Sequence, residues 1–226
     1  MEREPSLFEM LLQVAGPLLY LSLQASCVLI AVDILKQKSV GKRSSLTFVS
    51  LLVCGFYWTI YGLFKREMTI LVPNAISLLT ASFCMWAYYK HAIYKPTKLY
   101  CAAGVAIGCA VVMAALGSVS SVGLAGCLLS VAVSGSPLAV VNTVIIEKST
   151  ASLPFSTSLV TWVNTLSWVG YGCFISHDLM VVLPNALGFA LASLQLLLFG
   201  VYGFDSPKQN PEGSISSDEF ENPYNV

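Results

Sequence analysis

Charged side chains are scarce in this sequence. Asp, Glu, Lys and Arg make up 11% of its 226 residues, whereas 56% are hydrophobic and the mean hydropathy is +0.73. Ordinary soluble domains carry about 25% charged residues, so the composition excludes a water-soluble domain and indicates a membrane protein. The net charge is zero, and no basic stretch is interleaved with aromatic residues. We therefore expect no nucleic-acid partner.

Groups that carry catalysis or bind metals are also few. His91 and His177 lie in or beside loops, and no H-E-x-x-H, G-x-S-x-G or Gly-rich phosphate loop occurs. The seven cysteines fall in apolar segments without C-x-x-C spacing, which is typical of buried thiols rather than of a metal site or a disulfide. We expect no enzyme activity, no metal and no cofactor.

Ionisable residues are missing from the centres of the apolar segments. Asp33, Glu67 and Asp178 lie at segment ends, where we expect solvated carboxylates. Proton relays and voltage sensors need ionisable groups within the membrane. Their absence favours passive movement of a solute over ion-driven transport.

Long hydrophobic runs are plentiful instead. A spanning helix needs about 20 apolar residues, and runs of that size lie at 12–35, 46–64, 69–89, 99–117, 122–146, 154–175 and 179–203. The predicted fold class is an all-α membrane protein with seven transmembrane helices. Lysines and arginines are concentrated on one side, which places the N-terminus outside and the C-terminus in the cytosol. We expect the plasma membrane, with an endomembrane as the alternative.

The chain also repeats itself. It reads WTIYGLFKREMTILVPNA over residues 58–75 and WVGYGCFISHDLMVVLPNA over residues 168–186. With one inserted residue, seven of 18 positions are identical, where average residue usage predicts about one. We infer two related three-helix units, 12–90 and 122–203. The linker helix at 99–117 returns the chain so that both units run the same way, which gives a 3+1+3 plan with parallel repeats.

Each unit places a tryptophan and an asparagine at matching depth. With the helical rise of about 1.5 Å per residue, Trp58 lies ~9 Å and Asn74 ~8 Å from the outer ends of their helices, and Trp168 and Asn185 repeat this arrangement. Together the four would line a pocket with flat apolar faces and amide groups. Such a pocket suits a sugar, whose C–H faces stack on indole while its hydroxyls pair with amides. Two structural alternatives stay open, namely an aromatic belt for the tryptophans and helix-to-helix contacts for the asparagines.

Four prolines are candidate hinge or gate residues. Pro73 and Pro184 each directly precede a site asparagine and free backbone carbonyls in the preceding turn, which allows a bend. Pro137, within the fifth span, and Pro154, at the start of the sixth, lie toward the cytosolic side. Proline in a spanning helix is also frequently tolerated without such a role.

Together these features resemble the SWEET family of sugar facilitators. The resemblance rests on the two units, their Tyr-Gly, acid and Pro-Asn pattern, and the segments SGSPLAVVNTVIIEKSTASLPF (134–155) and LASLQLLLFGVY (191–202). It implies passive, bidirectional transport of mono- or disaccharides by alternating access, with the substrate near the midplane. The family's substrate-contacting asparagines match Asn74 and Asn185, and its aromatic wall matches Trp168. Trp58 stands where plant members can carry a small residue, which favours a hexose such as glucose over sucrose.

The resemblance also implies four prolines near the cytosolic gate, two in each unit. Pro137 and Pro154 match the second pair, whereas Cys27 and Thr47 hold the first-unit positions. The first unit is therefore expected either to move more as a rigid body or to bend by another device.

Other interpretations fit part of the pattern. A heptahelical receptor shares the helix count and the external N-terminus but has no need of an internal duplication, and a related carrier could move another small neutral solute. We expect residues 1–11 to be extracellular and residues 204–226, with one base and five acids, to be a disordered cytosolic tail. The expected partners are the sugar and the lipid bilayer, and a homo-oligomer is compatible with the pattern.

Overall fold

The computed structural model describes residues 6–41, 43–133 and 135–204, except for the side chains of residues 135–137. The first part of the predicted extracellular segment, residues 1–5, and the predicted tail from residue 205 onward lie outside the described residues. Within these ranges the chain is helical and contains no strand. Its helices are α1 (Leu7–Gln37), α2 (Leu46–Lys65), α3 (Met68–His91), α4 (Thr97–Ala115), α5 (Val119–Val133), α6 (Gly135–Glu147), α7 (Phe155–Phe174) and α8 (Leu179–Tyr202).

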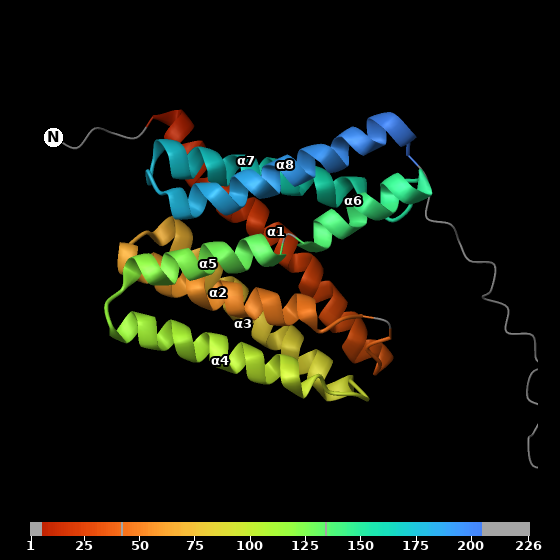
Figure 1. Ribbon diagram of the computed structural model, residues 1–226, viewed down its shortest axis with the longest axis horizontal. Helices are drawn as coiled ribbons and strands as arrows, with labels where there is room; N and C mark the ends of the chain where they lie inside the picture. The colour runs from red at the N-terminus through yellow and green to blue at the C-terminus, as the bar shows by residue number, and fades with distance from the viewer. Residues whose placement is uncertain (1–5, 42, 134, 205–226) are drawn as a thin grey trace, which may run out of the picture.

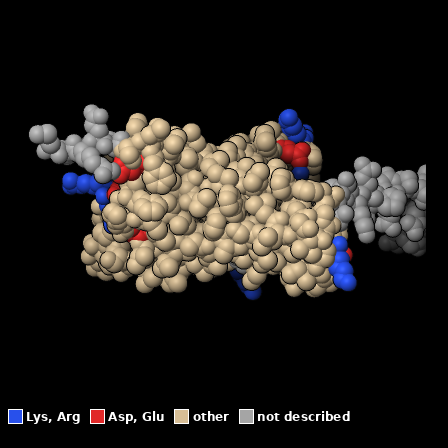
Figure 2. Space-filling view, turned by 90° about the horizontal axis from the view of Figure 1, so that it is seen from above, with Lys and Arg blue, Asp and Glu red and all other residues tan. Residues whose placement is uncertain are grey.

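These helices confirm the seven predicted spans, of which the fifth consists of α5 followed by α6. Six spans, with α5 and α6 counted as one, are long and apolar enough to cross a membrane. The remaining span, α7, is more polar because it carries several Ser and Thr residues and one Asn. Figure 2 shows that charged groups gather toward the two ends of the molecule and leave its middle largely uncharged. This distribution fits a protein that spans a bilayer.

The first helix begins earlier than predicted, at Leu7 rather than at residue 12. Ser6 accepts a hydrogen bond from the backbone N–H of Glu9, and the Glu9 carboxylate accepts one from the N–H of Ser6. This capping box satisfies two of the backbone donors that a helix start leaves free. Hydropathy alone could not locate this start, because it rests on side-chain bonds.

The helices form two units that are built alike. In the first unit α3 packs against both α1 and α2, and in the second α8 packs against α5, α6 and α7. The units meet where α1 contacts α7 and where α2 contacts α5, and these pairs are equivalent when the units are exchanged. The linker helix α4 lies against α2 and α5.

Both units also run in the same direction (Figure 1). The start of α1 and the α2–α3, α4–α5 and α7–α8 turns lie at one end of the molecule, which we call the N-terminal end. The α1–α2, α3–α4 and α6–α7 turns lie at the opposite end, which we call the C-terminal end. The predicted 3+1+3 plan is therefore present.

The repeated sequence motif forms the same turn in both units. The backbone N–H of Glu67 donates to the carbonyl of Gly62, and that of Asp178 donates to Gly172, both at 3.0 Å. A Cβ atom on Gly62 would lie 2.8 Å from the backbone N of Leu71. Glycine at this position therefore allows α2 and α3 to approach closely.

Both units contain a close contact between their second and third helices, but the glycine of that contact lies on the second helix in the first unit and on the third helix in the second unit. In the first unit, a Cβ atom on Gly55 of α2 would lie 3.6 Å from Oγ of Ser77 on α3. In the second, a Cβ atom on Gly188 of α8 would lie 2.9 Å from Cγ2 of Thr165 on α7. Thr165 is equivalent to Gly55, and Gly188 is equivalent to Ser77. Each pair thus combines one glycine with one larger residue.

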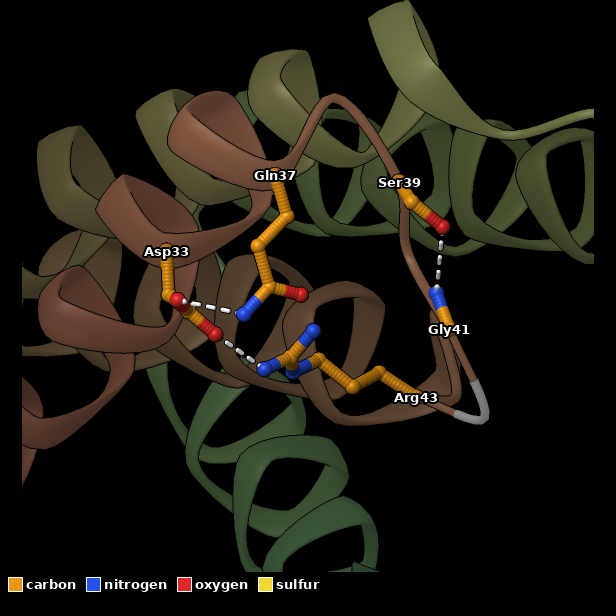
Figure 3. Close-up of polar contacts among 5 residues, drawn as sticks. All are labelled: Asp33, Gln37, Ser39, Gly41 and Arg43. Atoms are coloured by element: carbon orange, nitrogen blue, oxygen red, sulfur yellow. Dashed lines mark hydrogen bonds and ion pairs between the residues drawn. The ribbon is translucent and has the colours of Figure 1, made fainter. Parts of the chain in front are cut away.

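Polar contacts fasten the α1–α2 loop to the end of α1 (Figure 3). Arg43 pairs with one carboxylate oxygen of Asp33, and the other oxygen accepts from Nε2 of Gln37 at 2.8 Å. The carbonyl of Arg43 accepts from the hydroxyl of Tyr88 on α3 at 3.2 Å. The loop is thereby joined to two helices of the first unit.

A buried polar cluster joins α1 to α3 further along. The Tyr20 hydroxyl donates to Oγ of Ser77 at 2.9 Å, and Nε2 of Gln24 donates to Tyr20 at 2.9 Å and also to Ser77. The Cys84 thiol donates to the carbonyl of Cys27 at 3.4 Å. The first unit is therefore held together by side-chain bonds on both sides of Cys27, and α1 runs unbroken through that residue.

The equivalent span of the second unit consists of α5 and α6. α5 ends at Val133 and α6 begins at Gly135 with Pro137 in its first turn, and residue 134 between them lies outside the described residues. A proline ring in a helix conflicts with the carbonyl four residues earlier, which for Pro137 belongs to Val133, the last residue of α5. At the equivalent place α1 has Cys27, which keeps its N–H. The side chain of Pro137 lies outside the described residues.

Candidate functional site

Two hydrogen bonds between the units close the N-terminal end. The hydroxyl of Tyr61 on α2 donates to Oδ2 of Asp178 at 2.6 Å, and that of Tyr171 on α7 donates to Oε2 of Glu67 at 2.8 Å. Tyr61 is equivalent to Tyr171, and Glu67 to Asp178. Each unit therefore offers its tyrosine and its acid to the other, which explains why this pattern recurs in the sequence.

Asp178 is not the solvated carboxylate that its place at a helix end predicts. The residue is only 6% exposed. Its Oδ1 accepts from the backbone N–H of Met180 at 3.0 Å, while Oδ2 accepts from Tyr61 and lies 3.2 Å from Nζ of Lys65. The prediction was wrong because the cap of α8 and the donors of the first unit replace water around this carboxylate.

Each predicted site tryptophan packs against a glycine of the opposite unit. A Cβ atom on Gly126 of α5 would lie 3.6 Å from Cε2 of Trp58, and one on Gly16 of α1 would lie 3.2 Å from Cε2 of Trp168. Gly16 and Gly126 are equivalent positions, so the two indoles occupy equivalent slots. Nε1 of Trp58 donates to Oγ of Ser130 at 3.0 Å, whereas Nε1 of Trp168 makes no hydrogen bond to a described residue. Because Trp168 is buried, it is not a lipid-facing belt residue.

The two tryptophans share one apolar cluster beside the closure. Its buried members are Ile70, Trp168, Tyr171 and Val181, and Trp58 and Ile175 pack against them. Ile70 on α3 and Val181 on α8 are equivalent, and each lies one turn before the predicted site asparagine of its unit. The cluster therefore connects the tyrosine–carboxylate bonds to the level of the asparagines.

Asn74 and Asn185 make the same side-chain bond in the two units. Nδ2 of Asn74 donates to the carbonyl of Ile70, and Nδ2 of Asn185 to that of Val181, both at 2.8 Å. Residues four apart share a helix face, so both asparagines follow the faces that Ile70 and Val181 turn into the cluster between the units. Each bonds within its own helix, which argues against a helix-to-helix contact. Their Oδ1 atoms make no hydrogen bond to a described residue and are available acceptors.

Asn164 is a further buried polar residue beside Trp168, about one helical turn deeper, and sequence reasoning missed it. It lies one turn before Trp168 on α7 and is 6% exposed. Its Oδ1 is buried without a hydrogen-bond partner in the described part of the chain. An unpaired buried polar group costs about 1–3 kcal/mol, so packing does not account for it. The repeat gave no signal for Asn164, because the equivalent residue is Cys54. The spacing of four residues from Trp168 was a signal, because it places Asn164 on the same face of the helix.

The candidate hinge residues occupy different settings. Pro73 and Pro184 are buried inside α3 and α8, and neither helix is interrupted beside them. Pro154 is the exposed N-cap of α7, and Thr47 is exposed in the first turn of α2. None of these four has a side-chain hydrogen bond to the opposite unit among the described residues.

Seven spans in two parallel three-helix units, with equivalent polar residues between them, define a multi-pass membrane carrier. Comparison with known families agrees. The model of a family described as "sugar efflux transporter for intercellular exchange" matches residues 10–98 and again residues 120–206, one match for each unit. The chain belongs to this family, the SWEET sugar transporters.

Individual relatives support this assignment. The chain is 27% identical to the bidirectional sugar transporter SWEET17 of Arabidopsis thaliana over 83% of each protein. It is 30% identical to the sugar transporter SWEET1 of Drosophila pseudoobscura pseudoobscura over 74% of this chain and 78% of that protein. A structure of a eukaryotic SWEET transporter at 3.7 Å resolution is similar with a TM-score of 0.75 and 25% identity, covering 87% of this chain and 99% of that one. The chain is thus an integral membrane protein that transports sugar, a non-enzymatic kind of function.

Proposed function

We propose that the chain is a passive uniporter for a hexose such as glucose and works by alternating access. The observation that carries the proposal is that the two units contribute equivalent residues at the same depth between them. Both tryptophans belong to one cluster, and the cluster lies under a closure to which each unit contributes a tyrosine and an acid. A solute held between the units can reach either side of the membrane in turn when the units change how they meet.

The free hydrogen-bonding groups favour a neutral polyol. In Asn74 and Asn185 one N–H of Nδ2 bonds to the residue's own helix, which leaves the second N–H and Oδ1 for a ligand, and Asn164 adds another acceptor. The free N–H of Trp168 is a donor. Sugar hydroxyls both donate and accept, so they can satisfy all of these groups.

The two indoles favour a single sugar ring. Trp58 and Trp168 occupy equivalent slots on either side of the unit boundary and pack into the same cluster. A second indole in place of a small residue takes up space that a second sugar ring would need. Its flat face offers a stacking surface for the C–H groups of a pyranose.

We also propose that the N-terminal end faces the outside of the plasma membrane, as the concentration of lysines and arginines at the C-terminal end favours. The described hydrogen bonds and ion pair between the units involve Tyr61, Tyr171, Trp58 and Lys65, all in the half of their helices toward the N-terminal end. The conformation is therefore closed to the outside. To test the orientation, a protease site is added to the N-terminus of the protein and protease is applied to intact cells. Cleavage is expected, and complete protection of the site would contradict the orientation.

Counterflow of labelled glucose in proteoliposomes tests the transport proposal. We expect Asn185→Ala and Trp168→Phe to lower exchange at least about tenfold, the effect of losing one good hydrogen bond in a desolvated site. Asn142→Ala, exposed on α6, and Trp162→Phe, whose indole N–H bonds to Ser193 at 2.8 Å, are matched controls that should keep exchange. Unchanged exchange in both site variants would refute the site, and no exchange of any hexose by the wild type would refute the substrate.

A further inference from the structure

One surface patch away from the transport site combines lysines with exposed aromatic rings. It covers the last turns of α3, the loop to α4 and the first turn of α4, and we call it the α3–α4 corner. Its members are Trp86, Tyr89, Lys90, Ile93, Tyr94, Lys95 and Lys98. Ile93 and Tyr94, at the tip of the loop, are 87% and 89% exposed. Large apolar and aromatic groups at a loop tip are poorly placed in water but well placed in the headgroup layer of a bilayer.

Within the described residues, no carboxylate pairs with the positive charge of this corner. The sequence contains no Asp or Glu between Glu67 and Glu147. Asp33, a carboxylate at the same end of the first unit, is already paired with Arg43. None of the three lysines of the corner forms an ion pair with a described residue. An anion is therefore the complementary partner.

The lysines are held at the depth of the aromatic rings. Nζ of Lys95 lies 4.0 Å from the centroid of the Tyr89 ring, and Nζ of Lys90 lies 5.2 Å from that of Trp86. A cation over a ring face is attracted to it, yet each ammonium has three N–H donors and keeps some for another partner. Both lysines are exposed, so these donors are accessible.

The start of α4 adds to the same potential. Its N-cap is Pro96, which forms no side-chain cap, and the first turn carries Lys98 and no acid. The backbone N–H of Thr97 donates to the carbonyl of Lys95 and that of Leu99 to the carbonyl of Pro96, so the helix start contributes the N–H of Lys98 and the positive end of the helix dipole. In this corner the uncapped helix start stands beside lysine ammoniums, a combination that suits a phosphate group.

We propose that the α3–α4 corner binds the phosphate of anionic phospholipid headgroups, with Trp86, Ile93 and Tyr94 set among the lipids. This inference does not depend on the substrate. Only the assignment to the cytosolic leaflet rests on the orientation proposed above. The preference of cytosolic loops for lysine explains positive charge at this end, but Lys36, Lys38 and Lys148 share that end without a ring beside them in the described structure. Each lysine that contacts the lipid phosphate should enrich anionic lipid about fivefold.

The test uses Trp86 as a reporter. The full chain is placed in phosphatidylcholine vesicles that contain a fixed fraction of phosphatidylserine or phosphatidylcholine with brominated acyl chains, and the quenching specific to Trp86 is taken as the difference from Trp86→Phe. Brominated phosphatidylserine should quench Trp86 at least about threefold more effectively than brominated phosphatidylcholine at low salt. High salt should reduce the difference because exposed charges are screened.

Two triple variants separate the corner from the net charge of the protein. Lys90→Gln, Lys95→Gln and Lys98→Gln together should abolish the preference for phosphatidylserine. The matched set of Lys36→Gln, Lys38→Asn and Lys148→Asn removes as many charges from the same end and should retain it. Asn is chosen at Lys38 and Lys148 because both have left-handed φ, 52° and 50°.

Three outcomes would overturn the inference. Equal quenching by the two lipids in the wild type would show no headgroup preference, and equal losses in the two triple variants would show an effect of net charge only. Suppression of the preference by millimolar inorganic phosphate at constant ionic strength would indicate a site for a soluble anion instead. Glucose counterflow, measured on the same vesicles, reports separately on the transport proposal.

Discussion

Asn164 is buried beside Trp168 with an amide oxygen that has no partner among the described residues. Leucine has nearly the same size and removes the unpaired polar group. We expect Asn164→Leu to raise the apparent melting temperature in detergent by about 2–4 °C while it lowers glucose exchange. Asn142→Leu, at an exposed position on α6, should change neither quantity. Parallel loss of stability and transport would show that Asn164 only supports the fold.

The crossed pair of tyrosine–carboxylate bonds should control access from the N-terminal end. Hydrogen bonds to charged groups contribute about 1.5–3 kcal/mol, so Tyr61→Phe and Tyr171→Phe should each favour opening at least about tenfold. The measurement is the rate at which an impermeant thiol reagent added at that end labels a cysteine placed at Gly126, in a chain otherwise free of cysteine.

The control for this experiment is Tyr57→Phe. Tyr57 lies on the same helix as Tyr61, but its hydroxyl donates to the carbonyl of Ala106 on α4 at 2.8 Å and so does not join the units. Its labelling rate should equal that of the parent chain. If the Tyr61→Phe, Tyr171→Phe double variant is labelled no faster than the Tyr57→Phe chain, the bonds do not hold the end shut.

At the scale of residues, the sequence revealed which positions belong to the site but not which of them bond to one another. The repeated Tyr, acid, Trp and Asn positions are visible in the two aligned segments, and the structure places the tryptophans in one cluster. The direction of the bonds was not visible, because repetition does not tell whether Tyr61 bonds to the acid of its own unit or to that of the other. The burial of Asp178 could not be predicted for the same reason.

At the scale of elements, the α2–α3 turn depends on Gly62. A Cβ atom there would lie 2.8 and 2.9 Å from backbone atoms of Leu71, which cannot move without shifting α3. At Gly172 the nearest atom is Cγ2 of Val182 at 2.6 Å, a side-chain atom. Overpacking costs about 1–3 kcal/mol, so Gly62→Ala should lose the most thermal stability and Gly172→Ala should lose less.

Thermal denaturation in detergent, followed by a thiol-reactive dye, checks this order. Gly104→Ala on α4 is the control, because nothing lies within 4 Å of its Cβ position. Alanine is a better helix former than glycine by about 1 kcal/mol, so this variant should be at least as stable as the parent. A Gly172→Ala variant less stable than Gly62→Ala would contradict the role given to the Leu71 backbone.

Elements were predicted well where hydropathy decides them and less well where single contacts do. The seven spans follow from long apolar runs that few alternative folds can bury. The early start of α1 depends on one capping box.

At the scale of the whole molecule, the arrangement of charge predicts that flux needs no proton gradient. The described level of the site contains amides and indoles, and the nearby carboxylates Glu67 and Asp178 are engaged by tyrosines and by Lys65. Initial rates of glucose uptake into vesicles should be the same with and without a protonophore, and with either direction of an imposed pH difference. A rate that follows the gradient by more than about twofold would contradict passive transport.

The glycine of the close helix contact lies on opposite helices in the two units, and this position affects which substitutions the protein can accept during evolution. In one unit α2 carries the glycine and α3 the larger residue, while in the other α8 carries the glycine and α7 the larger residue. A gain of bulk at Gly188 should therefore be rescued by a matching loss at Thr165, as Ser77 and Gly55 already illustrate. Suppressor screens should therefore recover compensating substitutions within the same three-helix unit. Each unit can then change in sequence while the spacing of its helices stays the same.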